Sequence, residues 1–422
     1  MMSVSLSDSD RQMLDGRRGE GAKMAMSILV RMAEVYEAEE LMDVSQAHID
    51  GCGLMSEAGL EFAEALASKG ARVAVPTTLN MGPLDLQNWR EFGIPEEFAA
   101  GAIRQAAAYE RMGCVPTWTC APYQGYLTPR FGQQIAWGES NAILYANSVL
   151  GARTNRYGDY IDICAAITGR VPKCGLHLDE NRKGQILLRL VDIEEEYWNE
   201  DGSHAALGHL IGPLAEDKVA VLDGMPPHVS DDQLKALCAA AASSGAVALL
   251  HIVGVTPEAK TLEEAFRGNT PRRVVELTRA DLAAALADLS TASEGDPLDL
   301  VVLGCPHFSF SEFSRLAELL NGQSAEAFDP RVEFVVISGR ASFSLVQRSE
   351  IMQVLNAWGV RVTLDTCPFH TPMVGPNVKV LMTNSGKCAY YAPGELGVRV
   401  AFGSMADCVR SAVEGRVCRK EL

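Results

Sequence analysis

The sequence predicts an α/β protein built from more than one doubly wound unit. The chain has 422 residues, which exceeds a single common core, and its 47% hydrophobic and 22% charged residues are typical of a folded protein. Short apolar segments alternate with helical segments along most of its length. This alternation indicates parallel sheets covered by helices, in which ligands bind beyond the carboxyl ends of the strands.

The first part of the chain, residues 1–200, shows the alternation with polar loops after its strands. Ser7 or Asp8 is suited to cap the first helix, because both side chains accept hydrogen bonds from free backbone N–H groups. In order, we expect one or two amphipathic helices within 7–40, a strand running into Asp50-Gly-Cys-Gly53, a helix at 57–69, a strand at 71–75, a loop at 76–82, a helix at 97–112, a helix or buried segment at 157–169 and a strand at 185–191. We interpret residues 1–200 as an N-terminal α/β domain.

The second part, residues 201–422, repeats strand and helix more regularly. The expected strands are 219–222, 246–252, 273–277, 298–303, 334–337, 361–364, 379–382 and 398–401, with helices at 231–243, 261–266, 279–290 and 311–320. The pattern over 206–340 predicts a second doubly wound unit, and we interpret residues 201–422 as a C-terminal α/β region.

Charge and cysteine content limit the partners and the compartment. The net charge of −17 disfavours nucleic acid and anionic membranes, because both bind basic surfaces. No run of roughly 18 apolar residues is present, and residues 1–18 lack the apolar stretch of a secretory signal. We therefore expect a cytoplasmic protein, in which the 11 cysteines are free thiols or metal ligands rather than disulfides.

Three cysteines share one sequence context. Cys120 is followed by Ala-Pro, and Cys305 and Cys367 are each followed directly by proline. The last two come after expected strands, and a neighbouring proline stiffens a ligand loop. Three thiolates can hold an iron–sulfur cluster and leave one position for a substrate oxygen.

Spacing alone leaves a second interpretation open, because free cysteine is among the most buried residue types and often serves as a small hydrophobe. The chain has no C-x-x-C pair, the local pattern that favours zinc or a ferredoxin-type cluster. Cys52 lies in a polar loop and is discussed below. The other cysteines are assigned to the core or to structural roles: Cys114, Cys164, Cys174, Cys238, Cys388, Cys408 and Cys418.

Polar loops supply further candidates. Lys387, within Thr383-Asn-Ser-Gly-Lys-Cys-Ala389, is either a solvated loop lysine or a clamp for a substrate carboxylate or phosphate. His48 and Asp50 could orient a polar substrate, although an Asx turn explains Asp50 equally well. Three histidines near polar loops, at positions 177, 307 and 370, receive no role, because a lone histidine is more often structural than catalytic.

A succession of motifs in one order covers nearly the whole chain. They are His48-Ile-Asp-Gly-Cys52, Val75-Pro-Thr-Thr-Leu-Asn80, Tyr109-Glu-Arg-Met-Gly113, Cys120-Ala-Pro-Tyr123, Ile135-Ala-Trp-Gly-Glu-Ser140, Ala146-Asn-Ser-Val-Leu-Gly-Ala-Arg-Thr-Asn155, Gly175-Leu-His-Leu-Asp-Glu-Asn-Arg182, Gly304-Cys-Pro-His307 and Thr383-Asn-Ser-Gly-Lys387. This succession resembles the catalytic large subunit or domain of the aconitase X family.

The resemblance implies an aconitase-like fold, with α/β domains around a central cleft, and a hydro-lyase that dehydrates a hydroxy acid without isomerising it. It assigns an iron–sulfur cluster (2Fe–2S, 3Fe–4S or 4Fe–4S) to Cys120, Cys305 and Cys367. It assigns the substrate pocket to Gly51, Cys52, Gly53, Asn80, Met81 and Lys387. Lys387 is the expected catalytic residue of this chain.

The family also needs a smaller swivel domain, fused or separate, which carries a serine thought to act in proton transfer. No such domain is recognisable before the last residue, Leu422. We therefore expect a separate small swivel-domain subunit and a heterodimer.

Two branches of the family differ in substrate. The mevalonate 5-phosphate branch tends to carry Gly-Val-Ser and Asn-Pro at the first two pocket loops, whereas this chain has Gly51-Cys-Gly53 and Asn80-Met81. The sequence therefore resembles the branch that dehydrates cis-3-hydroxy-L-proline. The alternatives are a phosphomevalonate dehydratase with Arg153, Arg156 and Arg182 near the phosphate, or a non-catalytic partner subunit with a structural cluster or zinc.

Overall fold

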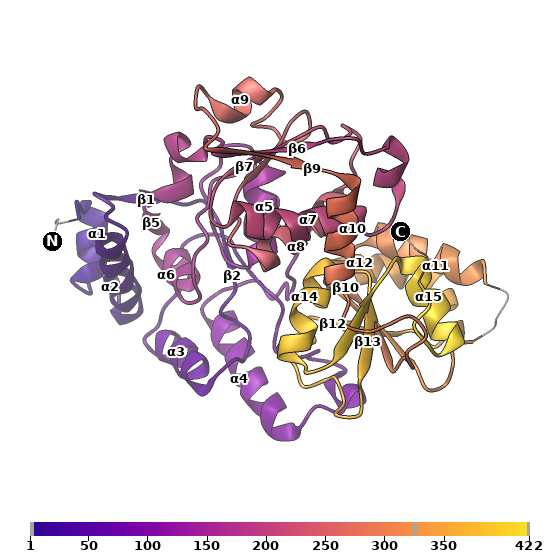
Figure 1. Cartoon of the computed structure of the whole chain (residues 1–422). Coiled ribbons are helices and arrows are strands. Elements are labelled where there is room, and N and C mark those ends of the chain that lie inside the picture. The colour runs from indigo at the N-terminus through magenta and orange to yellow at the C-terminus, as the bar shows by residue number, and fades with distance from the viewer. Residues whose placement is uncertain (1–3, 324–326, 420–422) are drawn as a thin grey trace.

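The computed structural model describes residues 4–323 and 327–419 (Figure 1). The described residues form four sheets, three of which contain only parallel pairs. Helices cover these sheets, so the predicted α/β class is confirmed. Helices α1 (Asp8–Leu14) and α2 (Glu20–Val35) lie together at one edge of the molecule in Figure 1.

The first part of the chain contains a three-stranded parallel sheet in the order β3-β2-β4 and a small antiparallel pair, β1 with β5. Its elements are α1 (Asp8–Leu14), α2 (Glu20–Val35), β1 (Leu41–Asp43), β2 (Ala47–Ile49), α3 (Glu57–Ser68), β3 (Thr77–Leu79), η1 (Trp89–Phe92), α4 (Glu96–Arg111), β4 (Ala136–Trp137), α5 (Ser140–Ser148), α6 (Ile161–Thr168) and β5 (Arg170–Pro172). Ser7 caps α1 through a capping box with Asp10, as the sequence predicted.

The strand expected at 71–75 is wrong, because the structure begins the strand at Thr77. The backbone N–H groups of Val73 and Ala74 donate to the carbonyls of Met112 and Ala166 instead of to a neighbouring strand. The chain joins the sheet only after Pro76, where three consecutive residues are buried beside β2. The expected loop at 76–82 therefore contains a strand.

The middle part contains a four-stranded parallel sheet in the order β8-β7-β6-β9. Its elements are η2 (Gly175–His177), η3 (Asp179–Arg182), β6 (Ile186–Leu190), η4 (Glu195–Asn199), α7 (Ser203–Ala215), β7 (Ala220–Asp223), α8 (Asp231–Ser244), β8 (Leu250–Ile252), α9 (Leu262–Phe266), β9 (Arg273–Leu277) and α10 (Arg279–Asp288). Helices α5, α7 and α8 contribute to the core beneath this sheet.

The last part contains a five-stranded parallel sheet in the order β12-β11-β10-β13-β14. Its elements are β10 (Leu300–Phe308), α11 (Phe310–Asn321), β11 (Glu333–Ser338), α12 (Arg340–Val346), α13 (Ile351–Ala357), β12 (Arg361–Leu364), β13 (Val380–Thr383), α14 (Gly386–Glu395), β14 (Arg399–Phe402) and α15 (Met405–Glu414). The strand order reverses between β10 and β13, the kind of point at which doubly wound sheets bind ligands.

The strands expected to form one unit over 206–340 are thus divided between two sheets, and β6 belongs to the first of them. The division of the chain near residue 200 stays a prediction.

All 11 cysteines lie in the described ranges and are free thiols. Among the residues that the structure describes, no helix is both long and apolar enough to cross a membrane.

Candidate active site

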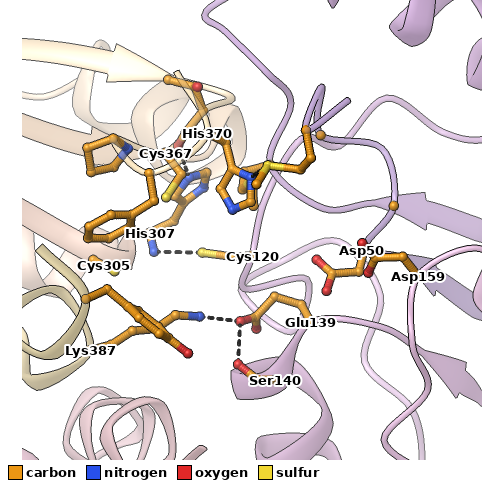
Figure 2. Close-up of a pocket in the computed structure, with 18 of the residues that line it drawn as sticks. Asp50, Cys120, Glu139, Ser140, Asp159, Cys305, His307, Cys367, His370 and Lys387 are labelled. Atoms are coloured by element: carbon orange, nitrogen blue, oxygen red, sulfur yellow. Dashed lines mark hydrogen bonds and ion pairs between the residues drawn. The ribbon is translucent and has the colours of Figure 1, made fainter. Parts of the chain in front are cut away.

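A cavity of about 350 Å³ lies where carboxyl ends of strands from the three-stranded and the five-stranded sheet meet (Figure 2). From the first sheet, β2 leads to Asp50 and Gly51, and β4 leads to Glu139. From the other, β10 contains Cys305, and β12 leads to Cys367. The cavity therefore occupies the position at which parallel sheets bind ligands.

The three predicted ligand cysteines all line this cavity, although they lie far apart in sequence. Cys305 stands in an irregular part of β10, because Leu303 pairs with Val336 while Phe308 pairs with Ser338, which loops the residues between them out of the ladder. Cys367 lies three residues beyond the end of β12. Cys120 follows a segment hydrogen-bonded to β3, in which the Thr119 N–H donates to the Leu79 carbonyl at 3.1 Å.

The three cysteine side chains would need a positively charged group beside them in order to be deprotonated. Burial, and then the charge of Glu139, raise the pKa of Cys120 to about 12, although Lys387 acts to lower it. Burial, and then the proximity of Cys305, raise the pKa of Cys367. Three thiolates at one cavity would need more positive charge than Lys387 provides, so the donor set fits a metal cluster.

Within the described ranges, no group of three or more His, Cys, Asp or Glu side chains is placed to hold one metal ion. In a 3Fe–4S or 4Fe–4S cluster each cysteine binds its own iron atom, and in a 2Fe–2S cluster three cysteines are divided between two irons, so the thiols need to line one cavity but need not meet at one point. The fit therefore rests on the shared cavity and on the chemistry of the three thiols.

Lys387 lies in the first turn of α14, where Ser385 caps the helix by accepting from the Cys388 N–H at 3.0 Å. Its Nζ donates to Oε1 of Glu139 at 2.5 Å inside the cavity. Burial acts to lower the pKa of Lys387, but the charge of Glu139 and then of Cys305 outweigh it, so that the pKa is raised. Lys387 is therefore a partly buried, ion-paired cation, with 15% of its side chain exposed, rather than a solvated loop lysine.

Glu139 is a site residue that the sequence did not single out. Burial acts to raise its pKa, but Lys387, first by charge and then by hydrogen bonding, holds the pKa below its ordinary value. Its Oε2 accepts from the Ala142 N–H at 2.7 Å, which caps α5, and its backbone has a φ of 66°. The ion pair with Lys387 and the hydrogen bond that caps α5 together hold the Glu139 carboxylate in place in the cavity.

A group of carboxylates lies on the side of the cavity away from Cys305 and Cys367 (Figure 2). Burial, and then the charges of Glu139, Asp159 and Asp162, raise the pKa of Asp50 to about 7. Asp50 accepts a hydrogen bond from Nδ2 of Asn80, and its own N–H donates to Oδ2 of Asp162 at 2.6 Å. Asp50 and Asp159 line the cavity itself, whereas Asp162 is fully buried behind them.

The other predicted pocket residues divide into two groups. Gly51, Gly53 and Met81 line the cavity. Cys52 and Asn80 are fully buried and lie behind that lining. The Cys52 thiol donates to the Ile49 carbonyl at 3.3 Å, and Asn80 holds Asp50, so both support the loop.

Two of the three arginines considered for a phosphate serve another purpose. Arg153 and Arg182 donate to Oε1 of the buried Glu258, at 2.9 Å and 2.5 Å, away from the cavity. Arg156 alone of the three lines the cavity, and its guanidinium donates to the carbonyls of Ala242 and Gly245. The lining of the cavity therefore contains more acidic than basic side chains. The four carboxylates belong to Asp50, Glu139, Asp159 and Glu395, and the two permanent cations are Arg156 and Lys387.

Family models match almost the entire chain. The aconitase X first domain matches residues 3–180, the second domain matches residues 187–287, and the third domain matches residues 298–414. These matches cover both sides of the cavity and all three cysteines discussed above.

The chain is also similar to proteins of known activity. It is 44% identical to the cis-3-hydroxy-L-proline dehydratase of Pseudomonas aeruginosa, over 96% of this chain and 70% of that protein. It is 40% identical to a protein of the same name from Hypocrea jecorina, over 98% of this chain and 69% of that protein. It is 39% identical to the phosphomevalonate dehydratase large subunit of Methanothermobacter thermautotrophicus, over 96% of this chain and 98% of that subunit.

The fold is similar to the crystal structure of aconitase X from Thermococcus kodakaraensis in its holo-form. The TM-score is 0.87 at 30% sequence identity, over 97% of this chain and the whole of the other. The expected aconitase-like arrangement of α/β domains is thereby confirmed.

Proposed function

The chain belongs to the aconitase X family of hydro-lyases, and from this premise we propose that it dehydrates cis-3-hydroxy-L-proline with an iron–sulfur cluster. The product would be a cyclic enamine that tautomerises to Δ1-pyrroline-2-carboxylate. The observation that carries the proposal is the divided cavity, with three thiols on one side and carboxylates on the other.

Cys120, Cys305 and Cys367 would hold the cluster. When bound, such a cluster supplies a Lewis acid that weakens the bond between carbon and the leaving hydroxyl oxygen. A reaction that removes only water is consistent with the three relatives described above, each of which is named a dehydratase.

Lys387 would bind the substrate carboxylate. Its ammonium lies in the cavity and is kept charged by Glu139, 2.5 Å away. Removal of the proton on the carbon beside the carboxylate develops enolate-like charge on the carboxylate oxygens. A fixed ammonium at that place stabilises this charge more than it stabilises the substrate, which lowers the barrier.

Asp50 and Asp159 would face the secondary ammonium of the proline ring. A substrate with a positive nitrogen suits a wall of carboxylates, because an ion pair replaces the lost hydration of both charges. Mevalonate 5-phosphate has no cationic group, and its phosphate would add two negative charges near Asp50, Asp159 and Glu139.

The second candidate is dehydration of mevalonate 5-phosphate, and Arg156 is the observation in its favour. A guanidinium at the cavity wall can bind a phosphate with two hydrogen bonds, although here it also donates to two backbone carbonyls. The occupation of Arg153 and Arg182 by Glu258 leaves less positive charge for this substrate than the sequence suggested.

A swivel domain would complete the site, and we propose that a separate small subunit provides it. The archaeal relative matched over 98% of its length is named a large subunit, whereas the two named hydroxyproline dehydratases extend beyond the match. The resemblance to the family assigns proton transfer to a serine of that domain.

The test is a substrate panel on the protein purified anaerobically together with its small subunit. We expect water loss from cis-3-hydroxy-L-proline, and no product from the trans isomer or from mevalonate 5-phosphate. Turnover of mevalonate 5-phosphate alone would replace the substrate assignment, and turnover that survives in both Lys387→Ala and Cys120→Ser would overturn the mechanism.

A further inference from the structure

His307 connects the three cysteine loops to one another. It follows Cys305 by two residues, and its ring and backbone contact the segments that contain Cys120 and Cys367. We propose that His307 is a positioning residue that holds the three cysteines in the arrangement that retains the cluster. This inference rests on the cluster of the proposed function.

The first contact is made by the backbone. The His307 N–H donates to Sγ of Cys120 at 3.3 Å. An N–H donor at a ligand sulfur stabilises the thiolate and helps to fix its direction, and such hydrogen bonds also tune the potential of iron–sulfur clusters.

The ring makes the other two contacts. Nδ1 lies 3.1 Å from Oγ1 of Thr119, beside Cys120, and Nε2 lies 2.8 Å from the carbonyl of Thr366, beside Cys367. A carbonyl only accepts, so Nε2 must carry the hydrogen, and the Thr119 hydroxyl then donates to Nδ1. The side chain is almost fully buried, at 2% exposure, so water does not replace these partners.

The His307 carbonyl is anchored from the other side. It accepts from Nε2 of Gln124 at 2.9 Å and from Nζ of Lys235 at 3.3 Å. Lys235 is itself buried and is held by Glu312 at 2.5 Å and Asp232 at 3.0 Å. All polar groups of His307 are thus used, which makes it a fixed junction between the loops rather than a free base.

The cysteine loops depend on this junction because they come from different parts of the fold. Cys120 follows a segment beside β3, Cys305 stands in β10, and Cys367 follows β12. Loss of a hydrogen-bonding group behind a metal ligand typically lowers metal affinity about 10- to 100-fold. We expect a similar effect on retention of the cluster.

The experiment compares iron and acid-labile sulfide per chain, and the rate of iron release to a chelator, in wild type, His307→Leu and His307→Gln, each co-purified anaerobically with the small subunit. His251→Leu is the matched control, because His251 is equally buried and donates to the Arg182 carbonyl at 2.7 Å outside the cavity. Thermal unfolding of the cluster-free forms separates cluster effects from folding effects.

We expect His307→Leu to release iron about 10- to 100-fold faster than wild type. His307→Gln, which can still donate to the Thr366 carbonyl, should fall between them, and His251→Leu should match wild type. If His307→Leu does not fold, the comparison of His307→Gln with His251→Gln decides. Iron release at the wild-type rate from the His307 variants would overturn this inference alone, whereas wild type without iron would overturn the proposed cofactor and this inference together.

Discussion

The side chains of the cavity form two groups of opposite character. Thiols of Cys120, Cys305 and Cys367 occupy one side, and carboxylates of Asp50 and Asp159 occupy the other. The pair formed by Lys387 and Glu139 gives the cavity an ammonium that is held in place by an ion pair. In the proposed function, this separation would allow the substrate to present its hydroxyl, carboxylate and ammonium groups to different walls of the cavity.

Replacement of Lys387 by alanine should abolish most of the activity and leave iron in place. In the proposed mechanism the variant loses the ammonium that would stabilise charge on the substrate carboxylate, a change that typically costs about 10²- to 10³-fold in kcat. Steady-state kinetics on cis-3-hydroxy-L-proline measures the loss, and iron analysis measures the cluster. Lys379→Ala, at an exposed lysine outside the cavity, should retain wild-type kinetics, and equal kinetics in the two variants would contradict the role of Lys387.

Activity should rise with pH through neutrality because of Asp50. Burial and neighbouring carboxylates raise the pKa of Asp50 to about 7, so the group is protonated and neutral below that pH and negatively charged above it. Only the charged form pairs with a substrate ammonium, so KM should fall as pH increases from 6 to 8, a range chosen as about one unit on each side of that pKa.

The Asp50→Asn variant tests this assignment, because asparagine keeps the shape but has no charge to titrate. We expect a higher KM and the loss of the step near neutral pH. A pH profile identical to that of wild type would show that another group causes the step.

At the next level, short parallel strands and the turns after them position these side chains. Gly138 connects β4 to Glu139 and the start of α5. A Cβ at Gly138 would lie 2.6 Å from Cβ of Asp50 and 2.9 Å from Oδ2 of Asp162. Only glycine lets the two strand ends approach so closely.

Gly138→Ala should therefore destabilise the protein by about 1–3 kcal/mol, the usual cost of overpacking, and should lower activity through displacement of Asp50 and Glu139. Thermal unfolding and kinetics measure the two effects. Gly158→Ala is the matched control, because a Cβ there meets nothing within 4 Å. Equal stability of the two variants would contradict the close approach.

Many elements could be predicted because local signals and tertiary packing agree. Ser230 and Ser309 begin α8 and α11 with capping boxes, and the apolar strands before them are buried on both faces. Strand β3 was misplaced because the apolar alternation lies before Pro76, while the pairing that defines the strand lies after it. Pairing partners are a tertiary property that a local pattern does not contain.

The candidate site could be predicted in part. The prolines one or two positions after Cys120, Cys305 and Cys367 and the polar loop around Lys387 led to residues that share one cavity. Glu139 was missed because its place in the site depends on its ion pair with Lys387, which is 248 positions away in sequence. The one signal for it was a carboxylate in a Gly-Glu-Ser turn directly after a short strand.

Across the whole molecule, the cavity depends on how the first part of the chain joins the last. Asp85, which is 2% exposed, accepts from the N–H groups of Gln87 and Asn88 at 3.0 Å each and from the Leu364 N–H at 3.2 Å. The Gly82 N–H also donates to the Asp365 carbonyl at 2.5 Å. These bonds connect the loop after β3 to the loop that contains Cys367.

Asp85→Ala should destabilise the protein by about 1–3 kcal/mol, because it leaves buried N–H donors without a partner. It should also reduce iron retention, since the loop that contains Cys367 loses a connection to the loop after β3. Thermal unfolding and iron analysis measure the two effects, with the exposed Asp43→Ala as control. A destabilised variant that retains full iron would contradict the link between this contact and the cluster.

The proposed function requires that three cysteines far apart in sequence hold one cluster on one side of the cavity. The most direct measurement is iron and acid-labile sulfide in the anaerobically purified protein with its small subunit, beside Cys120→Ser, Cys305→Ser and Cys367→Ser. Cys418→Ser, outside the cavity, is the control. We predict iron and sulfide in wild type and in the control, and their loss in each of the other three variants. Wild type without iron, or iron that all three variants retain, would contradict the proposed cluster site.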